Sequence, residues 1–339
     1  MTYEPGDVIV YFATIYPACE KTVLYITETT PAEAEKIKYT YPVSDKTLCE
    51  ALETTITTIK ANGKNPKLAI FDTIVSLPGV RMPFESLNII CKRHNILSLI
   101  DGAHGIGHVP LDLSSLDPDF FVSNCHKWLH VPRGCAVFYV PERNQHLMRS
   151  TIPTSHGFVP LPQEGEGEGA INNPLPPSGK SGFVTSFEFV GTQDDAPLLC
   201  VPASLAWRKK LTWKGKVGEE AAMDYIHELA RKSGQIVSDV LGTEILENEE
   251  GTLGNCCFSN VRLPLSEPEL AGGDLQTQTK IGQWIVKTLV EQYDTFIAVI
   301  FFGDSWWVRL SAQVYLTEDD FVWAGNTLKQ VCGRVQNGE

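Results

Sequence analysis

The chain has 339 residues, of which 43% are hydrophobic and 20% charged, and its formal net charge is −13. This length suggests two domains, and the acidic balance argues against a nucleic-acid partner, since phosphate contacts require a surplus of lysine and arginine. No apolar run reaches the ~18 residues of a membrane span, so no membrane partner is expected. Nine cysteines without paired metal spacing predict reduced thiols in a cytoplasmic protein and no metal site.

The N-terminal half alternates strand-like and helix-like segments. Apolar runs rich in β-branched residues predict strands at 7–13, 36–41, 67–75, 97–101, 119–123 and 135–140. Helical spacing of apolar residues predicts helices at 19–29, 46–61 and 84–94. Near-continuous apolar strands separated by helices are typical of an α/β fold, with a mainly parallel central sheet covered on both faces. Such a sheet binds its ligand at the carboxyl ends of the strands.

The second half begins after a change in composition. The segment 163–182 is rich in glycine, proline and glutamate and is predicted to be a flexible loop. Beyond it we expect helices at 196–210, 218–241, 281–293 and 318–332, and strands at 258–264, 296–302 and 307–310. This alternation predicts a large domain at 1–195 and a smaller C-terminal α/β domain at 196–339.

Two motifs at strand ends are the most informative feature of the chain. They read Asp101-Gly-Ala-His104 and Asn124-Cys-His-Lys127. An acid that ends one strand and a lysine that follows the next are what a pyridoxal 5′-phosphate (PLP) enzyme needs. The lysine amine binds the cofactor aldehyde covalently, and the acid keeps the pyridine nitrogen protonated so that the ring can accept electrons. Lys127 and Asp101 are therefore the candidate catalytic pair.

The two motifs resemble those of the class V aminotransferase family, which includes cysteine desulfurases and isopenicillin N epimerase-like proteins. The likeness covers essentially the whole chain. Within the family, the segments 101–108, 117–121, 124–129 and 309–311 resemble those of fungal hercynylcysteine sulfoxide lyases. The resemblance implies fold type I of the PLP enzymes, a large sheet domain with a small C-terminal domain, and a homodimer with shared active sites.

The resemblance also assigns roles around the cofactor ring. Ala103 would lie flat on one ring face, where only a small side chain fits. His104 would bind the cofactor 3′-oxygen, and Ser76 matches a position near the same atom. Tyr16 falls where the desulfurases stack a histidine on the ring, and its hydroxyl could donate a proton; the alternative is a core tyrosine. His108 is expected to be a structural histidine.

The remaining implied ligands bind the ends of the cofactor and the substrate. Asn124 and His126 are expected to hold the phosphate, and Thr192 would reach the phosphate site of a neighbouring subunit. Arg309, inside the apolar stretch 306–310, is the candidate clamp for the carboxylate of a small amino-acid substrate, because a guanidinium can donate two hydrogen bonds to a carboxylate.

The expected reaction is C–S cleavage of a cysteine sulfoxide conjugate, as in ergothioneine biosynthesis. The segment 291–307 contains no cysteine, which argues against the persulfide chemistry of the desulfurases. Cys19 and Cys125 lie near motif residues, so a redox or catalytic role for either stays open. One alternative is epimerisation or another PLP reaction of secondary metabolism. The other is an inactive paralogue, because the chain is expected to lack an N-terminal strand and phosphate loop that the resemblance implies.

Overall fold

A six-stranded sheet forms the centre of the N-terminal half. The computed structural model describes residues 1–149, 154, 158, 179–265 and 274–338. The sheet has the order β2-β1-β3-β6-β7-β8, and all neighbours are parallel except β7 and β8. Its strands are β1 (Asp7–Phe12), β2 (Glu33–Ile37), β3 (Asn65–Asp72), β6 (Leu97–Asp101), β7 (Phe120–Asn124) and β8 (Ala136–Tyr139). The mainly parallel α/β sheet predicted from the sequence is therefore confirmed.

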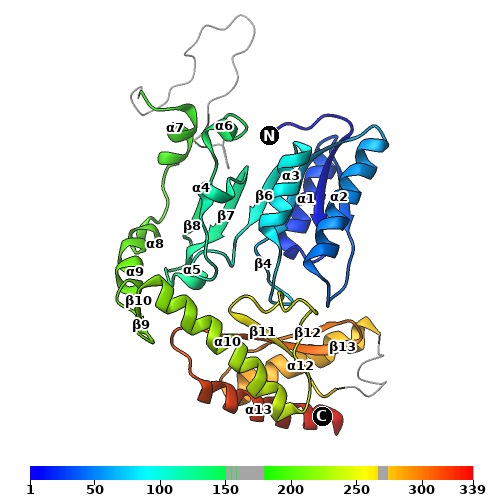
Figure 1. Cartoon of the computed structure of the whole chain (residues 1–339), viewed down its shortest axis with the longest axis vertical. Helices are drawn as coiled ribbons and strands as arrows, with labels where there is room; N and C mark the ends of the chain where they lie inside the picture. The colour runs from blue at the N-terminus through cyan, green and yellow to red at the C-terminus, as the bar shows by residue number, and fades with distance from the viewer. Residues whose placement is uncertain (150–153, 155–157, 159–178, 266–273, 339) are drawn as a thin grey trace, which may run out of the picture.

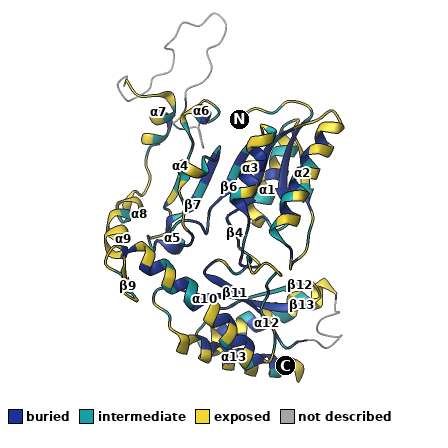
Figure 2. Cartoon of the chain, in the orientation of Figure 1, coloured by how far each residue is buried: buried dark blue, intermediate teal, exposed yellow. Residues whose placement is uncertain are grey.

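Apolar side chains cover both faces of this sheet. Val8, Val10 and Phe12 of β1 pack in one cluster with α2 (Asp45–Ala61) and α3 (Phe84–His94). Ile9 and Tyr11 point the opposite way and pack with α1 (Pro17–Thr29). The alternation follows from the two-residue period of a strand. Burial on both faces explains why the strands in the middle of the sheet read as near-continuous apolar runs, and Figure 2 shows this middle mainly in the buried colour. The edge strands β2 and β8 are partly exposed.

The predicted strand at 67–75 is broken in the structure. β3 ends at Asp72, and β4 (Ile74–Val75) pairs with β5 (Val80–Arg81) in a short antiparallel hairpin. Thr73 lies between the two strands and donates its N–H to the carbonyl of Asp101 at 2.9 Å. Because burial continues across the break, the apolar pattern does not reveal it. The hairpin carries the segment 76–79 away from the central sheet and toward the second sheet.

The second sheet has three antiparallel strands in the order β11-β13-β12. They are β11 (Phe258–Arg262), β12 (Ala298–Phe302) and β13 (Ser305–Ser311), and the associated helices are α10 (Glu219–Leu241), α12 (Leu275–Tyr293) and α13 (Glu318–Gln336). Gly303 and Asp304 have φ of 55° and 56°, which suits a two-residue hairpin turn between β12 and β13. In Figure 1, α13 lies below the second sheet, on the side away from the central sheet, and α10 runs from the level of α5 down to α13.

The remaining elements are short and lie between β6 and α10 along the chain. They are α4 (Leu113–Leu116), α5 (Cys125–Trp128), α6 (Glu142–Gln145), α7 (Gly182–Glu188), α8 (Ala196–Leu199), α9 (Val201–Arg208), β9 (Thr212–Trp213) and β10 (Lys216–Val217).

The single helix predicted at 196–210 is wrong: it is divided at Cys200, because Pro202 cannot donate a backbone N–H to a continuous helix. Most of the predicted loop at 163–182 lies outside the described residues. Among the described helices, none is long and apolar enough to cross a membrane.

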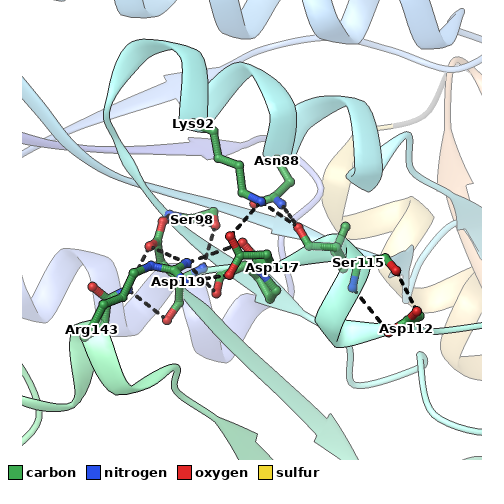
Figure 3. Close-up of polar contacts among 11 residues, drawn as sticks. Asn88, Lys92, Ser98, Asp112, Ser115, Asp117, Asp119 and Arg143 are labelled. Carbon is green, nitrogen blue, oxygen red and sulfur yellow. Dashed lines mark hydrogen bonds and ion pairs between the residues drawn. The ribbon is translucent and has the colours of Figure 1, made fainter.

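A polar network at the amino-terminal edge of the central sheet fixes β6 against β7 (Figure 3). The carboxylate of Asp119 accepts the Ser98 N–H at 3.0 Å and the Asn144 side-chain amide at 2.7 Å. Arg143 pairs with both Asp119 and Asp117, at 3.3 and 2.5 Å. The network lies at the opposite end of the strands from Asp101, so it holds the register of β6 and β7 without entering the site.

Asp119→Ala is expected to lower the free energy of unfolding by about 1–3 kcal/mol, because it leaves partly buried N–H donors without acceptors. The change would be measured as a lower urea midpoint. Asp112→Ala is the matched control, since Asp112 caps only the four-residue α4 and is exposed, so its loss should lower the urea midpoint less. Equal midpoints for the two variants would contradict the proposed role of Asp119.

Candidate active site

The carboxyl ends of three neighbouring strands bring the predicted residues together. Asp101 ends β6, and its cross-strand neighbours are Asp72 on β3 and Val122 on β7. β7 ends at Asn124 and leads directly into α5, which carries Lys127. Parallel strands place their carboxyl ends at one edge, where α/β sheets bind ligands. Asp72 is a second acid at this edge that the sequence analysis did not identify.

Asp101 is buried and has two hydrogen-bond donors of its own chain. Its Oδ1 accepts the N–H of Ala103 at 2.8 Å, which fixes the turn after β6. Its Oδ2 accepts the thiol of Cys19 at 3.5 Å. No lysine or arginine in the described part of the chain forms an ion pair with Asp101. A buried carboxylate without a cation is costly, so this position favours a cationic ligand.

Burial disfavours the ionised form of Asp72. It raises the pKa of Asp72 well above the usual range, and the nearby Asp101 raises it further. Two carboxylates at adjacent strand ends in a dry site oppose each other's ionisation.

Lys127 is half-buried, with its Nζ 3.2 Å from Nε2 of His104. Burial lowers the pKa of Lys127, and the charge of Arg309 acts in the same direction. Asp101 and Asp72 oppose this shift without reversing it. A lowered pKa increases the fraction of free amine, which is the nucleophilic form.

His104 is buried among aromatic rings next to Lys127. Its Nδ1 accepts the indole N–H of Trp128 at 3.1 Å. The ring of Phe258 lies edge-on to it, with centroids 5.2 Å apart. Burial lowers the pKa of His104 well below its usual range, and Lys127 adds to this effect. His104 is therefore neutral beside the lysine.

Arg309 reaches from β13 of the second sheet toward the central sheet. Its Nη1 donates to the carbonyl of Ser76 at 2.5 Å, and its guanidinium carbon lies 4.4 Å from the centre of the Phe258 ring. Burial lowers its pKa to about 10. Its buried Nε has no partner, and no carboxylate among the described residues pairs with it. Gly79 makes room for it, since a Cβ there would lie 2.5 Å from the Arg309 Cδ.

The two predicted phosphate ligands have unused donors. The buried Nδ1 of His126 has no hydrogen-bond partner, and the side chain of Asn124 makes none within the described residues. Buried polar atoms without partners are uncommon in folded proteins. These groups therefore suit a polar ligand at the start of α5.

The other predicted residues have fewer side-chain contacts with this site. Ser76 contacts Arg309 through its backbone carbonyl and not its hydroxyl. Tyr16 precedes α1 and is 52% exposed, so the alternative of a core tyrosine is wrong. Ala103 is half-buried in the turn after Asp101. Thr192 is exposed and has no bond to any of these residues in its own chain.

The cysteines at the site are protonated thiols. Burial raises the pKa of Cys19 to about 12, and the charge of Asp101 contributes. Burial also raises the pKa of Cys125 to about 11, with a further contribution from Cys135. A thiol with a raised pKa is a poor nucleophile. All nine cysteines are free, and Cys19 acts here as a donor to Asp101.

Arg208 is a supporting residue that the sequence analysis missed. It is only 2% exposed and forms a two-point ion pair with Glu219, with both contacts at 2.6 Å. It also donates to the carbonyls of Trp128 at 2.8 Å and Gly107 at 3.2 Å. These carbonyls lie just after the two motifs at 101–104 and 124–127, so Arg208 connects the two segments that follow the motifs. No local pattern in the sequence distinguishes it from a surface arginine on a helix.

His108 is structural, as expected. It is fully buried, and its Nε2 accepts the N–H of Cys257 at 2.5 Å. Its carbonyl accepts from Nε2 of His227 at 2.8 Å. These bonds connect the turn after β6 to α10 and to the segment before β11.

The residues at this edge fit PLP. Lys127 offers a free amine, and Asp101 is a buried acid without a cation. His104 offers an imidazole beside the lysine. The unpartnered His126 Nδ1 and the free amide of Asn124 supply donors that can meet an anionic group.

Comparisons with known proteins identify the family of this chain. The family model for class V aminotransferases matches residues 3–163. The L-cysteine desulfhydrase-like protein lolT1 of Epichloe uncinata is 40% identical over 355 residues, which cover 99% of this chain and 77% of that protein. The hercynylcysteine sulfoxide lyase of Schizosaccharomyces pombe is 29% identical, covering 97% of this chain and 74% of the other.

A solved structure supports the fold. The cysteine desulfurase CsdA from Escherichia coli matches with a TM-score of 0.68 at 16% identity, over 98% of this chain and 73% of that one. This likeness confirms fold type I, with a mainly parallel sheet and a further sheet domain. Together with the 40% identity across nearly all of its length, it shows that the chain belongs to the class V aminotransferase family, whose enzymes use PLP.

Proposed function

We propose that this enzyme is a PLP-dependent C–S lyase that cleaves a cysteine sulfoxide conjugate, as in ergothioneine biosynthesis. The observation that carries the proposal is Arg309, a buried guanidinium without a carboxylate partner in the described chain, which lies near Lys127 and His104. A desolvated cation of this kind is suited to the α-carboxylate of an amino acid. Support for the bond that is cleaved comes from the relatives named a cysteine desulfhydrase-like protein and a sulfoxide lyase.

The proposed roles of the ring-side residues follow from their contacts. PLP, when bound, supplies an electron sink for the reacting amino acid. Asp101 would hold a proton on the pyridine nitrogen, because a carboxylate without a cation stabilises a positive charge beside it. His104 would donate to the 3′-oxygen, and Ser76 would contribute near the same atom. Ala103 would leave room on one ring face, and Tyr16 would cover the other.

Lys127 would hold the cofactor through its Nζ, and the same amine, when free, would serve as the base for the proton on the substrate α-carbon. Arg309 would hold the substrate carboxylate and so orient the bonds at the α-carbon. Loss of the β-sulfur group and addition of one water would give pyruvate, ammonia and a sulfur-containing product.

The proposal includes a homodimer in the cytoplasm. Thr192 is exposed and free to reach the phosphate that Asn124 and His126 of another subunit hold. Nine free cysteines are typical of a reducing compartment. The domain division at residue 195 belongs to the same proposal.

Incubation of the PLP-loaded enzyme with S-substituted cysteine sulfoxides tests the reaction. The proposal expects stoichiometric pyruvate and a sulfur-containing product. An epimerase built on the same residues would instead racemise the α-carbon and release no pyruvate. Exchange of the α-proton with solvent without pyruvate would therefore reject the lyase in favour of that alternative.

Borohydride treatment of the loaded enzyme is expected to fix the cofactor permanently on Lys127, because burial lowers the pKa of this amine and so favours its nucleophilic form. Peptide mass spectrometry would locate the added pyridoxyl group. Lys127→Ala should retain none, whereas Lys210→Ala, at an exposed lysine, should be labelled like wild type. A label that persists in Lys127→Ala would show that another lysine binds the cofactor.

Arg309→Lys is expected to raise KM for the substrate by roughly 10–100-fold, because lysine loses a two-point contact with a charged group worth about 1.5–3 kcal/mol. The visible spectrum of the bound cofactor should change little. Arg262→Lys is the control, since Arg262 lies on the same sheet in a surface ion pair with Glu244 at 3.0 Å. Loss of PLP with unchanged KM would contradict the assignment of Arg309.

A further inference from the structure

The hydrogen bonds of His104 determine which of its nitrogens carries the proton. An indole N–H can only donate, so the 3.1 Å contact from Trp128 requires Nδ1 of His104 to be an acceptor. A neutral imidazole that accepts at Nδ1 carries its proton on Nε2. A doubly protonated ring is incompatible with this contact, because two N–H groups would face each other.

The same reasoning extends to Lys127. The proton on Nε2 of His104 points at Nζ of Lys127, 3.2 Å away. An ammonium group has three donors and no acceptor, so only the free amine can receive this hydrogen bond. The ring orientation is also fixed, because a flipped imidazole would place carbon atoms at both positions and lose both contacts.

We infer that Trp128 is a positioning residue: its indole N–H holds His104 in the tautomer that is protonated on Nε2 and thereby favours the free amine of Lys127. The inference rests on the proposed role of Lys127 as the cofactor lysine. It also explains how His104 could serve the bound cofactor, since Nε2–H is the donor that its proposed contact with the 3′-oxygen requires.

The position of Trp128 is itself well determined. Its ring centroid lies 4.0 Å from that of His108 and 5.4 Å from that of Phe258. Its carbonyl accepts from the buried Arg208 at 2.8 Å. The tryptophan is therefore held at both its ring and its backbone, and its N–H has little freedom to leave His104.

Several other charged or titratable groups act on Lys127. Asp101 on β6 and Asp72 on β3 favour the ammonium form, and Cys19 on α1 does so more weakly. Arg309 on β13 favours the free amine. None of these groups distinguishes the two nitrogens of His104, whereas the Trp128 N–H does.

The experiment uses the protein without cofactor, selectively labelled with ¹⁵N-histidine, so that neither PLP binding nor turnover enters the result. Two-bond ¹H–¹⁵N spectra at neutral pH distinguish a protonated from an unprotonated ring nitrogen, and His104→Gln assigns the signal among the eight histidines. The inference expects His104 with a bare Nδ1 and a protonated Nε2. A wild-type spectrum with the proton on Nδ1, or on both nitrogens, would overturn it without any further variant.

Trp128→Phe removes the donor and keeps an aromatic ring. His104 is then free to move its proton to Nδ1 and to accept from an ammonium, so the pKa of Lys127 should rise. The pH profile of acetylation of Lys127, followed by mass spectrometry, measures this pKa. A rise of one unit would slow labelling about tenfold at pH values below it.

Trp213→Phe is the matched control, because the buried Nε1 of Trp213 has no hydrogen-bond partner. It should leave both the His104 spectrum and the Lys127 profile as in wild type. A folded Trp128→Phe protein with an unchanged tautomer and an unchanged Lys127 profile would overturn the inference. A wild-type enzyme with the expected tautomer but without lyase activity would instead count against the proposed function alone.

Discussion

Removal of ionisable side chains from water at one edge of the central sheet is the constraint on which the site depends. Asp72 and Asp101 lie opposite each other on β3 and β6, and Lys127 lies near both. Charges in such a place are costly unless they are paired. Burial raises the pKa of Asp72 and lowers that of Lys127. Among the described residues, Asp101 has no cationic partner and Arg309 has no carboxylate partner, which suits a protonated pyridine nitrogen and a substrate carboxylate.

The site also depends on contacts between the two sheets. Gly79 exchanges hydrogen bonds with the Asn260 side chain of β11, at 3.1 and 2.8 Å, and its lack of a side chain admits Arg309. Arg208 holds the two motif segments from the other side. The proposed substrate clamp on β13 and the proposed cofactor residues on β6 and α5 are thus set relative to one another by buried polar contacts, whose loss leaves unsatisfied groups and is therefore costly.

The central sheet and the proximity of the motif residues could be predicted from the sequence, because both depend on patterns within short segments. Asp101, His104 and Lys127 lie within one segment of two strands, so their proximity follows from parallel pairing. Asp72 was missed because its significance depends on Asp101, which is its cross-strand neighbour but lies 29 positions away in the sequence. The proposed role of Trp128 could not be predicted either, because a tryptophan in an apolar sequence is expected in the core whether or not its N–H has a hydrogen-bond partner. Thr192 stays a prediction, because its proposed contact lies in another subunit.

The most direct test of the charge arrangement is the ¹⁵N NMR spectrum of the protein loaded with PLP labelled at the pyridine nitrogen. If Asp101 faces this atom as the ionised member of the acid pair, the nitrogen is protonated in wild type at neutral and moderately alkaline pH. In Asp101→Asn the amide cannot stabilise the positive charge, and the nitrogen should lose its proton. An unprotonated nitrogen in wild type, or an equally protonated one in Asp101→Asn, would contradict the assignment of Asp101.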